Sequence, residues 1–334
     1  MNLNSTSRFR VIFESREHYR LIDENKNIFA AEISGFFRFS AGSWPAVGDW
    51  VEGTAQPGGW ILIEEVLPRK SLLSRSDPGS ARPQILAANV DVLFVVTSAN
   101  PDFNLNRIER YVAMATSGGV LPVIVINKIE LAENAAALIS ETESRFTGLK
   151  VLGVSAVECR NLGELKSYVK PGLTVAFAGS SGVGKSSLTN ALTASEAMSV
   201  SAIREGDGRG RHTTTHRVLQ YFADNCAVID TPGLRSVGLS DGADLDSVFA
   251  EISASARHCR FRDCRHETEP GCAVKAAVDS GEIAPERIQN YNKLGRELAF
   301  EERKHNKAVM SESKKLWSKR SKAIRQNAKI RDDS

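Results

Sequence analysis

The sequence predicts an α/β protein of several domains, and three observations lead to this fold class. Roughly the first 80 residues carry only short β-type segments, which favours a small barrel. From about residue 88, apolar runs alternate with helical segments, which predicts a parallel sheet with helices on both faces. Three cysteines within 14 residues then predict a metal site in a helical C-terminal domain. The expected domains are therefore 1–82, 88–240 and 241–334.

Composition and charge limit what the chain as a whole can be. The 334 residues are 42% hydrophobic, and 43 basic against 40 acidic residues leave a net charge of +3. Any nucleic-acid binding must therefore rest on local patches. No signal peptide or membrane-length apolar run is visible, and the clustered, odd set of five cysteines favours metal binding over disulfides. We expect a soluble cytoplasmic protein.

The N-terminal barrel is predicted from short segments rich in Val, Ile and Phe. These are "FRVIFES", "HYRLID", "IFAAEI" and "WILIEEVL", and the turn-prone stretches "ENKN", "AGSWP" and "QPGG" lie between them. A sandwich would need more strands. The segments therefore favour a small barrel.

The central domain is predicted from buried-strand runs separated by helical segments. The runs are "VDVLFVVTS", "VLPVIVI", "LKVLGVS" and "LTVAFAG". Between the first two, Leu105, Ile108, Tyr111, Val112 and Ala115 share one helical face. This alternation is typical of a parallel sheet covered by helices on both faces.

The most specific signal is a phosphate-binding loop, "GSSGVGKSS", at residues 179–187. It has the form G-x-x-x-x-G-K-[ST] and lies directly between an apolar run and a helical segment. Backbone N–H groups and the helix dipole would hold phosphates, Lys185 would reach the β- and γ-phosphates, and Ser186 would bind Mg²⁺. A Gly/Ser-rich loop with an incidental lysine is the alternative.

Two later segments fit nucleotide-sensing loops. In "IDTPGL", Asp230 would support the Mg²⁺ shell and the N–H of Gly233 would meet the γ-phosphate, although D-x-P-G alone is also a common turn. The Gly/Arg-rich stretch 204–218 contains three threonines, and we take Thr214 as the Mg²⁺ ligand, with Thr213 and Thr215 as alternatives. A solvated loop is the other interpretation of this stretch.

A base-reading element lies upstream of these loops, in "VIVINKIEL". A carboxylate at Glu130 can accept from both N1–H and the 2-amino group of guanine, whereas adenine offers an acceptor at N1. The usual Asp is replaced here by Glu, whose extra methylene shifts the base or the loop by roughly 1 Å. "GVSA" at residues 153–156 would supply a backbone N–H for guanine O6. The order of motifs is a rotation of the usual GTPase order, which predicts a circularly permuted domain.

The chain resembles the ribosome small-subunit-dependent GTPase A (RsgA) family. The resemblance rests on "PAVGDWV", "PRKSLLSR", N-K-x-E, "GSSGVGKSS", "GRHTTT", "DTPG" and the cysteine cluster, and it covers nearly the whole length. It implies an OB-fold, a circularly permuted P-loop G domain and a zinc-binding C-terminal domain. It also implies GTP hydrolysis late in maturation of the small (30S) ribosomal subunit.

The expected nucleotide site contains many residues from both halves of the G domain. They are Asn127, Lys128, Ile129, Glu130, Ser155, Ala156, Gly179, Ser180, Ser181, Gly182, Val183, Gly184, Lys185, Ser186, Ser187, Asp230 and Gly233. We expect these residues to bind GTP or GDP with Mg²⁺.

Hydrolysis must proceed without the usual glutamine, because Leu234 follows the D-x-P-G motif. A leucine cannot orient the attacking water. His212 in "GRHTTT" is the nearest candidate, and the resemblance assigns that role to it. From the residues alone, a solvated loop histidine is the alternative. The expected catalytic residues are His212, Lys185 and Thr214.

Zinc is expected in "HCRFRDCRHETEPGC". Three thiolates and one imidazole, from Cys259, Cys264, His266 and Cys272, form the closed set of four that structural Zn²⁺ prefers. Three reduced core cysteines are the alternative. His258 could replace His266, and the resemblance favours His266.

Basic residues suggest RNA contacts in the C-terminal part of the chain, and a small β-barrel of the OB-fold kind would add a nucleic-acid surface at the other end. Three arginines lie among the zinc ligands, and residues 301–334 hold 11 Lys or Arg against 5 Asp or Glu. rRNA phosphates and a solvated charged helix are both compatible with this tail. We expect a monomer that binds the small ribosomal subunit and its rRNA and no membrane. A P-loop phosphotransferase and a non-catalytic nucleotide-gated RNA-binding module are the alternative functions.

Overall fold

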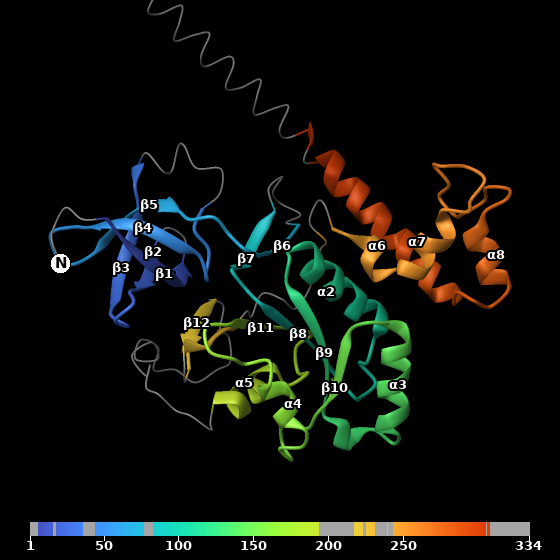
Figure 1. The fold of residues 1–334 in the computed structure, drawn as a ribbon, viewed down its shortest axis with the longest axis horizontal. Helices are drawn as coiled ribbons and strands as arrows, with labels where there is room; N and C mark the ends of the chain where they lie inside the picture. Colours follow the sequence, from blue (N-terminus) through green and yellow to red (C-terminus); the bar gives the residue numbers. More distant parts are fainter. Residues whose placement is uncertain are drawn as a thin grey trace, which may run out of the picture. The chain divides into compact units, whose positions relative to one another are not determined.

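Five strands close into a barrel near the N-terminus of the computed structural model (Figure 1). They run in the order β1-β2-β3-β5-β4, and β4 returns to pair with β1. Alternate side chains point inward, so that residues such as Phe9, Val11, Leu21 and Ile63 form a buried core. The strands are β1 (Thr6–Ser15), β2 (His18–Ile22), β3 (Ile28–Ile33), β4 (Trp50–Ala55) and β5 (Ile61–Val66). The predicted small barrel is confirmed.

The structure describes residues 6–15, 18–35, 44–76, 83–193, 217–222, 225–230, 239, 243–304 and 306–307. Two compact units are distinguished: one contains Met1–Arg75, Ile85–Val237 and Asp246–Val248, and the other contains the remaining residues. The barrel and the central sheet therefore belong to the same unit. No helix among these residues is long and apolar enough to cross a membrane.

The central sheet has the order β10-β9-β8-β11-β13-β12. Its strands are β8 (Val92–Ser98), β9 (Leu121–Asn127), β10 (Lys150–Gly153), β11 (Thr174–Ala178), β12 (Val218–Tyr221) and β13 (Ala227–Asp230). All neighbours are parallel except β12 and β13, so the sheet is mixed. Residues 222–226, which join these two strands, are too few for the crossover that a parallel pair requires.

Helices cover both faces of this sheet, as the sequence predicts. The helices are α2 (Leu105–Ser117), α3 (Ala135–Arg145), α4 (Leu162–Lys166) and α5 (Lys185–Thr193). Leu165 of α4 and Leu188 of α5 pack against Leu152 and its neighbours in one core. A Cβ on Gly153 would instead meet Ile139 of α3 at 2.5 Å. Because successive strand residues face opposite sides, α3 lies on the other face.

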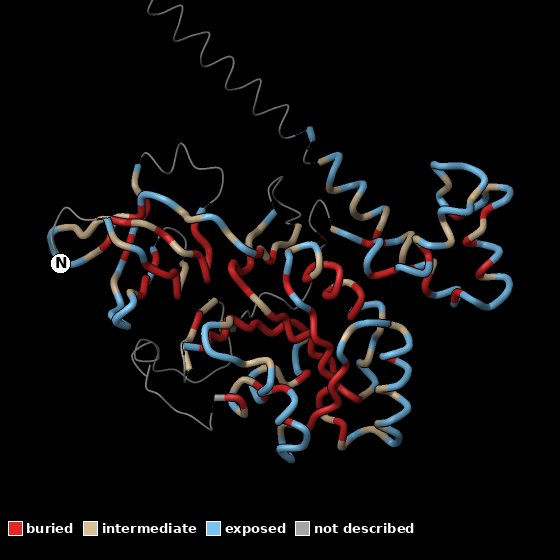
Figure 2. Tube along the Cα trace, in the orientation of Figure 1, coloured by how far each residue is buried: buried red, intermediate tan, exposed pale blue. Residues whose placement is uncertain are grey.

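The buried residues run along the central strands, and the outward helix faces are exposed (Figure 2). A two-stranded sheet of β6 (Leu72–Arg75) and β7 (Gln84–Ala88) lies between barrel and sheet in the sequence. The fully buried carboxylate of Asp49 accepts two hydrogen bonds from Arg69, at 2.8 and 2.7 Å. The conspicuous segments "PAVGDWV" and "PRKSLLSR" are therefore joined by a bidentate ion pair.

The C-terminal unit is helical among its described residues. It contains α7 (Ala250–Ala256) and α8 (Ala273–Asp279), while α6 (Leu245–Val248) is divided between the two units. Residues 285–304 form a further helix. Phe249 packs edge-on against Tyr291, with ring centroids 5.4 Å apart. Arg287 of the same helix binds Glu251 of α7, which fixes the two helices together.

Candidate functional site

The phosphate loop connects the end of β11 to the start of α5. Gly179, Gly182 and Gly184 have φ angles of 144°, 82° and 95°, values that side chains rarely tolerate. A Cβ on Gly179 would lie 2.1 Å from the carbonyl oxygen of Val96. Ser181, Ser186 and Ser187 are exposed, while Val183 is buried. The glycines thus let the loop pass close to β8 and present the N-terminus of α5, where anions bind favourably.

Lys185 is the first residue of α5, and its ammonium group lies back over the loop. Nζ donates to the carbonyl oxygens of Gly179 and Ser180 at 2.8 and 2.7 Å. These contacts hold the positive charge at the centre of the loop. The lysine is therefore positioned to meet phosphate oxygens there.

Asn127 connects the base-reading element to the phosphate loop. Its side chain is almost fully buried; Nδ2 donates to the carbonyl oxygen of Val183 at 2.9 Å, and Oδ1 accepts from the N–H of Ala156 at 3.1 Å. One side chain therefore holds three segments that are far apart in the sequence. Gly184 is required next to it, because a Cβ there would lie 2.2 Å from Asn127 Nδ2.

Lys128 and Glu130 extend from the turn that follows β9. Lys128 has a left-handed φ of 60°, and its Nζ donates to the carbonyl oxygen of Gly182 at 2.7 Å. Ile129, Glu130 and Leu131 form a short 3₁₀ helix. Oε2 of Glu130 is buried and has no hydrogen-bond partner among the described residues. An acceptor without a partner costs free energy, and a carboxylate is the group that recognition of guanine N1–H and the 2-amino group would use.

Ser155 and Ala156 follow β10, beside the turn of Glu130. Ser155 is fully buried, and its Oγ accepts from the N–H of Glu158 at 3.1 Å. The N–H of Ala156 is already bonded to Asn127, whereas the sequence suggested a free donor for guanine O6 in this segment. A base carbonyl would share this N–H or use a neighbouring one.

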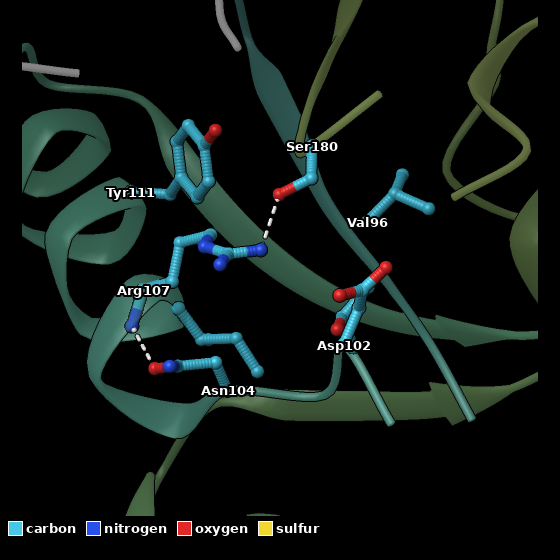
Figure 3. Close-up of a pocket in the computed structure, with 8 residues that line it drawn as sticks. Val96, Asp102, Asn104, Arg107, Tyr111 and Ser180 are labelled. Carbon is cyan, nitrogen blue, oxygen red and sulfur yellow. Dashed lines mark hydrogen bonds between the residues drawn. The ribbon is translucent and has the colours of Figure 1, made fainter. Parts of the chain in front are cut away.

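Arg107 is a neighbour of the phosphate loop that the sequence analysis missed. Its Nη1 donates to Ser180 Oγ at 2.6 Å, across 73 positions of sequence (Figure 3). The backbone N–H of Arg107 donates to the capping side chain of Asn104 at 3.0 Å, which fixes the start of α2. Only tertiary contact brings Arg107 to the loop, so no local pattern could have identified it.

The small cavity beside Arg107 is lined by residues of β8, α2 and the phosphate loop (Figure 3). Its volume of about 10 Å³ admits at most one water molecule. Burial raises the pKa of Tyr111 on its wall to about 12, although the guanidinium groups of Arg107 and Arg110 act in the opposite direction. The cavity lies beside the phosphate loop and is too small to hold a nucleotide.

Several predicted site residues lie outside the described residues. They are His212, Thr214 and Gly233. Asp230 is described only through its backbone, which pairs with Val218 at the end of β13. The strand end predicted for Asp230 is thus present, and the assignments of catalysis and Mg²⁺ binding remain predictions.

Four side chains of the C-terminal unit gather around one point. Cys259, Cys264, His266 and Cys272 place their ligand atoms within 4.8 Å of one another. His258 is exposed and does not belong to this group. The fourth member of the cluster is therefore His266.

The spacing of these atoms fits a tetrahedral zinc ion. Nδ1 of His266 lies 3.6 Å from Cys259 Sγ and 3.4 Å from Cys272 Sγ, and the two sulfur atoms are 3.9 Å apart. Bonds of about 2.3 Å to sulfur and about 2.0–2.1 Å to nitrogen imply edges of about 3.8 and 3.5 Å in a tetrahedron. The donor set and its dimensions both suit a closed structural site.

Glu269 stabilises the loop that carries these ligands. Its carboxylate accepts from the backbone N–H groups of Arg265, Glu267 and Thr268, each at 3.0 Å. These bonds, that from Arg265 first, lower the pKa of Glu269 to about 2. The carboxylate therefore stays charged over the whole neutral range and keeps the turn between His266 and Cys272 in shape.

Comparisons with known proteins show which family this chain is similar to. A family model described as RsgA GTPase matches residues 66–240. The small ribosomal subunit biogenesis GTPase RsgA 2 of Listeria monocytogenes is 39% identical over 324 residues, which cover 96% of this chain and 92% of the relative.

Two solved structures have the same fold. The crystal structure of YjeQ from Thermotoga maritima has a TM-score of 0.66 at 31% identity, and the match covers 88% of this chain and 99% of that one. The structure of YloQ, described as a circularly permuted GTPase, has a TM-score of 0.62 at 26% identity and covers 89% of this chain and 96% of its own.

Proposed function

The chain belongs to the RsgA GTPase family, and we propose that it is a GTP hydrolase which acts late in maturation of the small (30S) ribosomal subunit. The observation that carries the proposal is the hydrogen bond from Asn127 to Val183. Through it the N-K-x-E element and the phosphate loop form one site, although they occur in the order of a permuted G domain. A site built this way binds guanine nucleotides.

Each element of the site has a distinct part in binding GTP. The two oxygens of Glu130 would accept from guanine N1–H and the 2-amino group, and Lys128 would support the base from the loop side. Lys185 and the N–H groups of residues 180–186 would surround the β- and γ-phosphates. The hydroxyl of Ser186, at the exposed first turn of α5, would bind Mg²⁺ together with Thr214.

Hydrolysis requires a group that orients water, because Leu234 replaces the usual glutamine. We assign that role to His212. Asp230, at the end of β13, would stabilise the Mg²⁺ shell, and Gly233 would meet the γ-phosphate. Binding of the triphosphate itself, or of the ribosomal partner, would then bring His212 into position.

The C-terminal cluster would hold one structural Zn²⁺. Its four ligands leave no open position for water, so the metal stabilises the fold of this unit and takes no part in hydrolysis. Arg260, Arg262 and Arg265 are exposed beside the ligands and would contact rRNA phosphates. We further propose that the protein is a cytoplasmic monomer with three functional parts, 1–82, 88–240 and 241–334.

One experiment tests the function: nucleotide turnover with and without purified small ribosomal subunits, for GTP and for ATP. Stimulation by the subunits that is specific for GTP is the expected result. Turnover of both nucleotides at equal rates would contradict guanine recognition. The absence of any turnover would leave a nucleotide-gated RNA-binding protein, and phosphate transfer to a small acceptor would indicate a phosphotransferase.

A further inference from the structure

The side chain of Arg107 ends at the phosphate loop and makes a single contact there. It extends from the first turn of α2 toward Ser180 (Figure 3), and its Nη1 donates to Ser180 Oγ at 2.6 Å. Among the residues that the structure describes, its guanidinium makes no other hydrogen bond and no ion pair. The cation therefore binds one hydroxyl group of the loop, and no carboxylate holds it elsewhere.

The helix that carries Arg107 is a fixed support. Asn104 caps it, and its Oδ1 accepts the backbone N–H of Arg107 at 3.0 Å. Further along the helix, the fully buried carboxylate of Glu109 binds Nε of Arg145 in α3 at 2.7 Å, and the side chain of Tyr111 is buried. The guanidinium of Arg107 thus extends from a helix that is held at its start and along its length, which is what a positioning group requires.

Ser180 connects Arg107 to the lysine of the phosphate loop. Its hydroxyl accepts from Arg107, while its carbonyl oxygen accepts from Lys185 Nζ at 2.7 Å. The same Nζ donates to the carbonyl oxygen of Gly179 at 2.8 Å. Because the hydroxyl and the carbonyl belong to one residue, a displacement of Ser180 also displaces an acceptor of the ammonium group. The hydrogen bond from Arg107 therefore helps to fix the place of the Lys185 charge.

The phosphate loop depends on such anchors from outside. Three of its glycines have positive φ angles, and glycine leaves a backbone more conformational freedom than any other residue. The side chains of Asn127 and Lys128 hold the second half of the loop through two of its carbonyl oxygens. Arg107 gives the first half a corresponding anchor at Ser180. The G-x-x-x-x-G-K-[ST] pattern leaves position 180 open, so this hydroxyl serves a contact that the motif alone does not supply.

We propose that Arg107 is a positioning residue for GTP hydrolysis, which through Ser180 holds the phosphate loop in the shape that presents Lys185 to the β- and γ-phosphates. This proposal rests on the GTP hydrolysis of the proposed function and not on its ribosomal partner. In the transition state, negative charge spreads over the oxygens of the transferred phosphoryl group. A displaced ammonium group therefore costs more there than in bound GTP, whose affinity is shared with the base-reading residues.

The test separates the rate of hydrolysis from affinity in the full-length protein. Single-turnover hydrolysis of GTP, without and with small ribosomal subunits, and equilibrium binding of a non-hydrolysable GTP analogue are measured for wild type, Arg107→Gln, Arg107→Lys, Ser180→Ala and the double variant Arg107→Gln/Ser180→Ala. Lys150→Gln is the matched control. It removes one exposed charge at the start of the parallel strand β10, and the nucleotide loops follow the ends of such strands at the opposite edge of the sheet. Thermal melting verifies that each variant is folded.

We expect Arg107→Gln to lower the single-turnover rate by roughly 10- to 100-fold, the scale for a slightly misplaced reacting group, and to change affinity only a few-fold. Ser180→Ala should lower the rate by a similar factor. The double variant should be no slower than the slower single variant, because both substitutions break the same contact. Arg107→Lys keeps a cationic donor and should recover part of the rate. Lys150→Gln should match wild type.

Equal losses of rate and affinity in Arg107→Gln would overturn the proposal, because the residue would then only maintain the fold of the loop. If Ser180→Ala kept the wild-type rate while Arg107→Gln did not, or if the two losses were additive, the cation would act on the nucleotide directly, and the positioning role would be refuted. If wild-type turnover is not stimulated by subunits at all, the ribosomal part of the proposed function fails, and the single-turnover rates without subunits still decide the role of Arg107.

Discussion

Replacing Glu130 with glutamine tests how the site distinguishes guanine from other bases. The substitution keeps the length and shape of the side chain, removes one negative charge and turns one acceptor into a donor. Oε2 of Glu130 is buried without a hydrogen-bond partner among the described residues, so the variant loses no protein contact at this atom. A change in affinity that differs between GTP and ATP therefore reports on recognition of the base.

The size of the effect follows from the bonds that guanine would make. A carboxylate accepts from both N1–H and the 2-amino group, whereas a glutamine accepts one bond and turns its NH₂ toward the other donor. A hydrogen bond to a charged group contributes about 1.5–3 kcal/mol, so the loss of one bond weakens GTP binding about 10- to 150-fold. Inosine triphosphate lacks the 2-amino group, and its affinity should fall less.

The assay is equilibrium binding of GTP, inosine triphosphate and ATP to wild type, Glu130→Gln and Glu130→Asp, at constant Mg²⁺ concentration. Glu130→Asp keeps both acceptors and removes the methylene, so it should retain the preference for GTP over ATP within a few-fold. That comparison separates the charge of the side chain from its reach.

Two results would refute this reasoning. If Glu130→Gln weakened GTP and ATP by the same factor, Glu130 would stabilise the loop of residues 129–131 and would not read the base. If it left GTP binding unchanged, the unpaired oxygen would have no part in recognition.

The remaining predictions concern hydrolysis, the phosphate loop and the metal. His212→Ala should keep GTP affinity and lower turnover on small subunits by about 100-fold or more, and near-wild-type turnover would remove the residue from the mechanism. Gly184→Ala should abolish measurable GTP binding, because its φ is 95° and its Cβ would lie 2.2 Å from the base-reading asparagine. Gly163→Ala is its control, because no heavy atom lies within 4 Å there. Wild type should contain one zinc per chain by atomic absorption; Cys264→Ser should lose it and lower the melting temperature, while Cys159→Ser, an exposed thiol outside the cluster, should retain it.

The sequence could predict the parts of the site that depend on local backbone requirements. Gly179 and Gly184 need positive φ angles, and Asn127 must end a buried strand, so these positions permit few residue types. The cluster of three cysteines and one histidine could be predicted for a similar reason, since four donors of suitable type occur within a short stretch. The barrel and the alternating α/β order also follow from local periodicity.

Other features depend on contacts between distant segments, and no local pattern reports them. Arg107 reaches Ser180 only because α2 packs beside the end of β11. The antiparallel place of β12 could have been inferred from the short connection to β13, but the pairing of β12 with β1 could not.

Circular permutation determines which parts of the chain adjoin the nucleotide-sensing loops. In this order of motifs, the D-x-P-G loop is the last element of the G domain, and Leu239 of the C-terminal unit follows Gly233 by six residues. The stretch with His212 leads directly into β12, whose neighbour β1 belongs to the barrel. One loop is thus joined to the C-terminal unit through the peptide chain, and the other is connected to the barrel through the pairing of β12 with β1. An unpermuted domain would place the base-reading half between these loops and a C-terminal extension. Under the proposed function, contact of the ribosomal subunit with either flanking part would therefore reach one of these two loops, through the peptide chain in one case and through the pairing of β1 with β12 in the other.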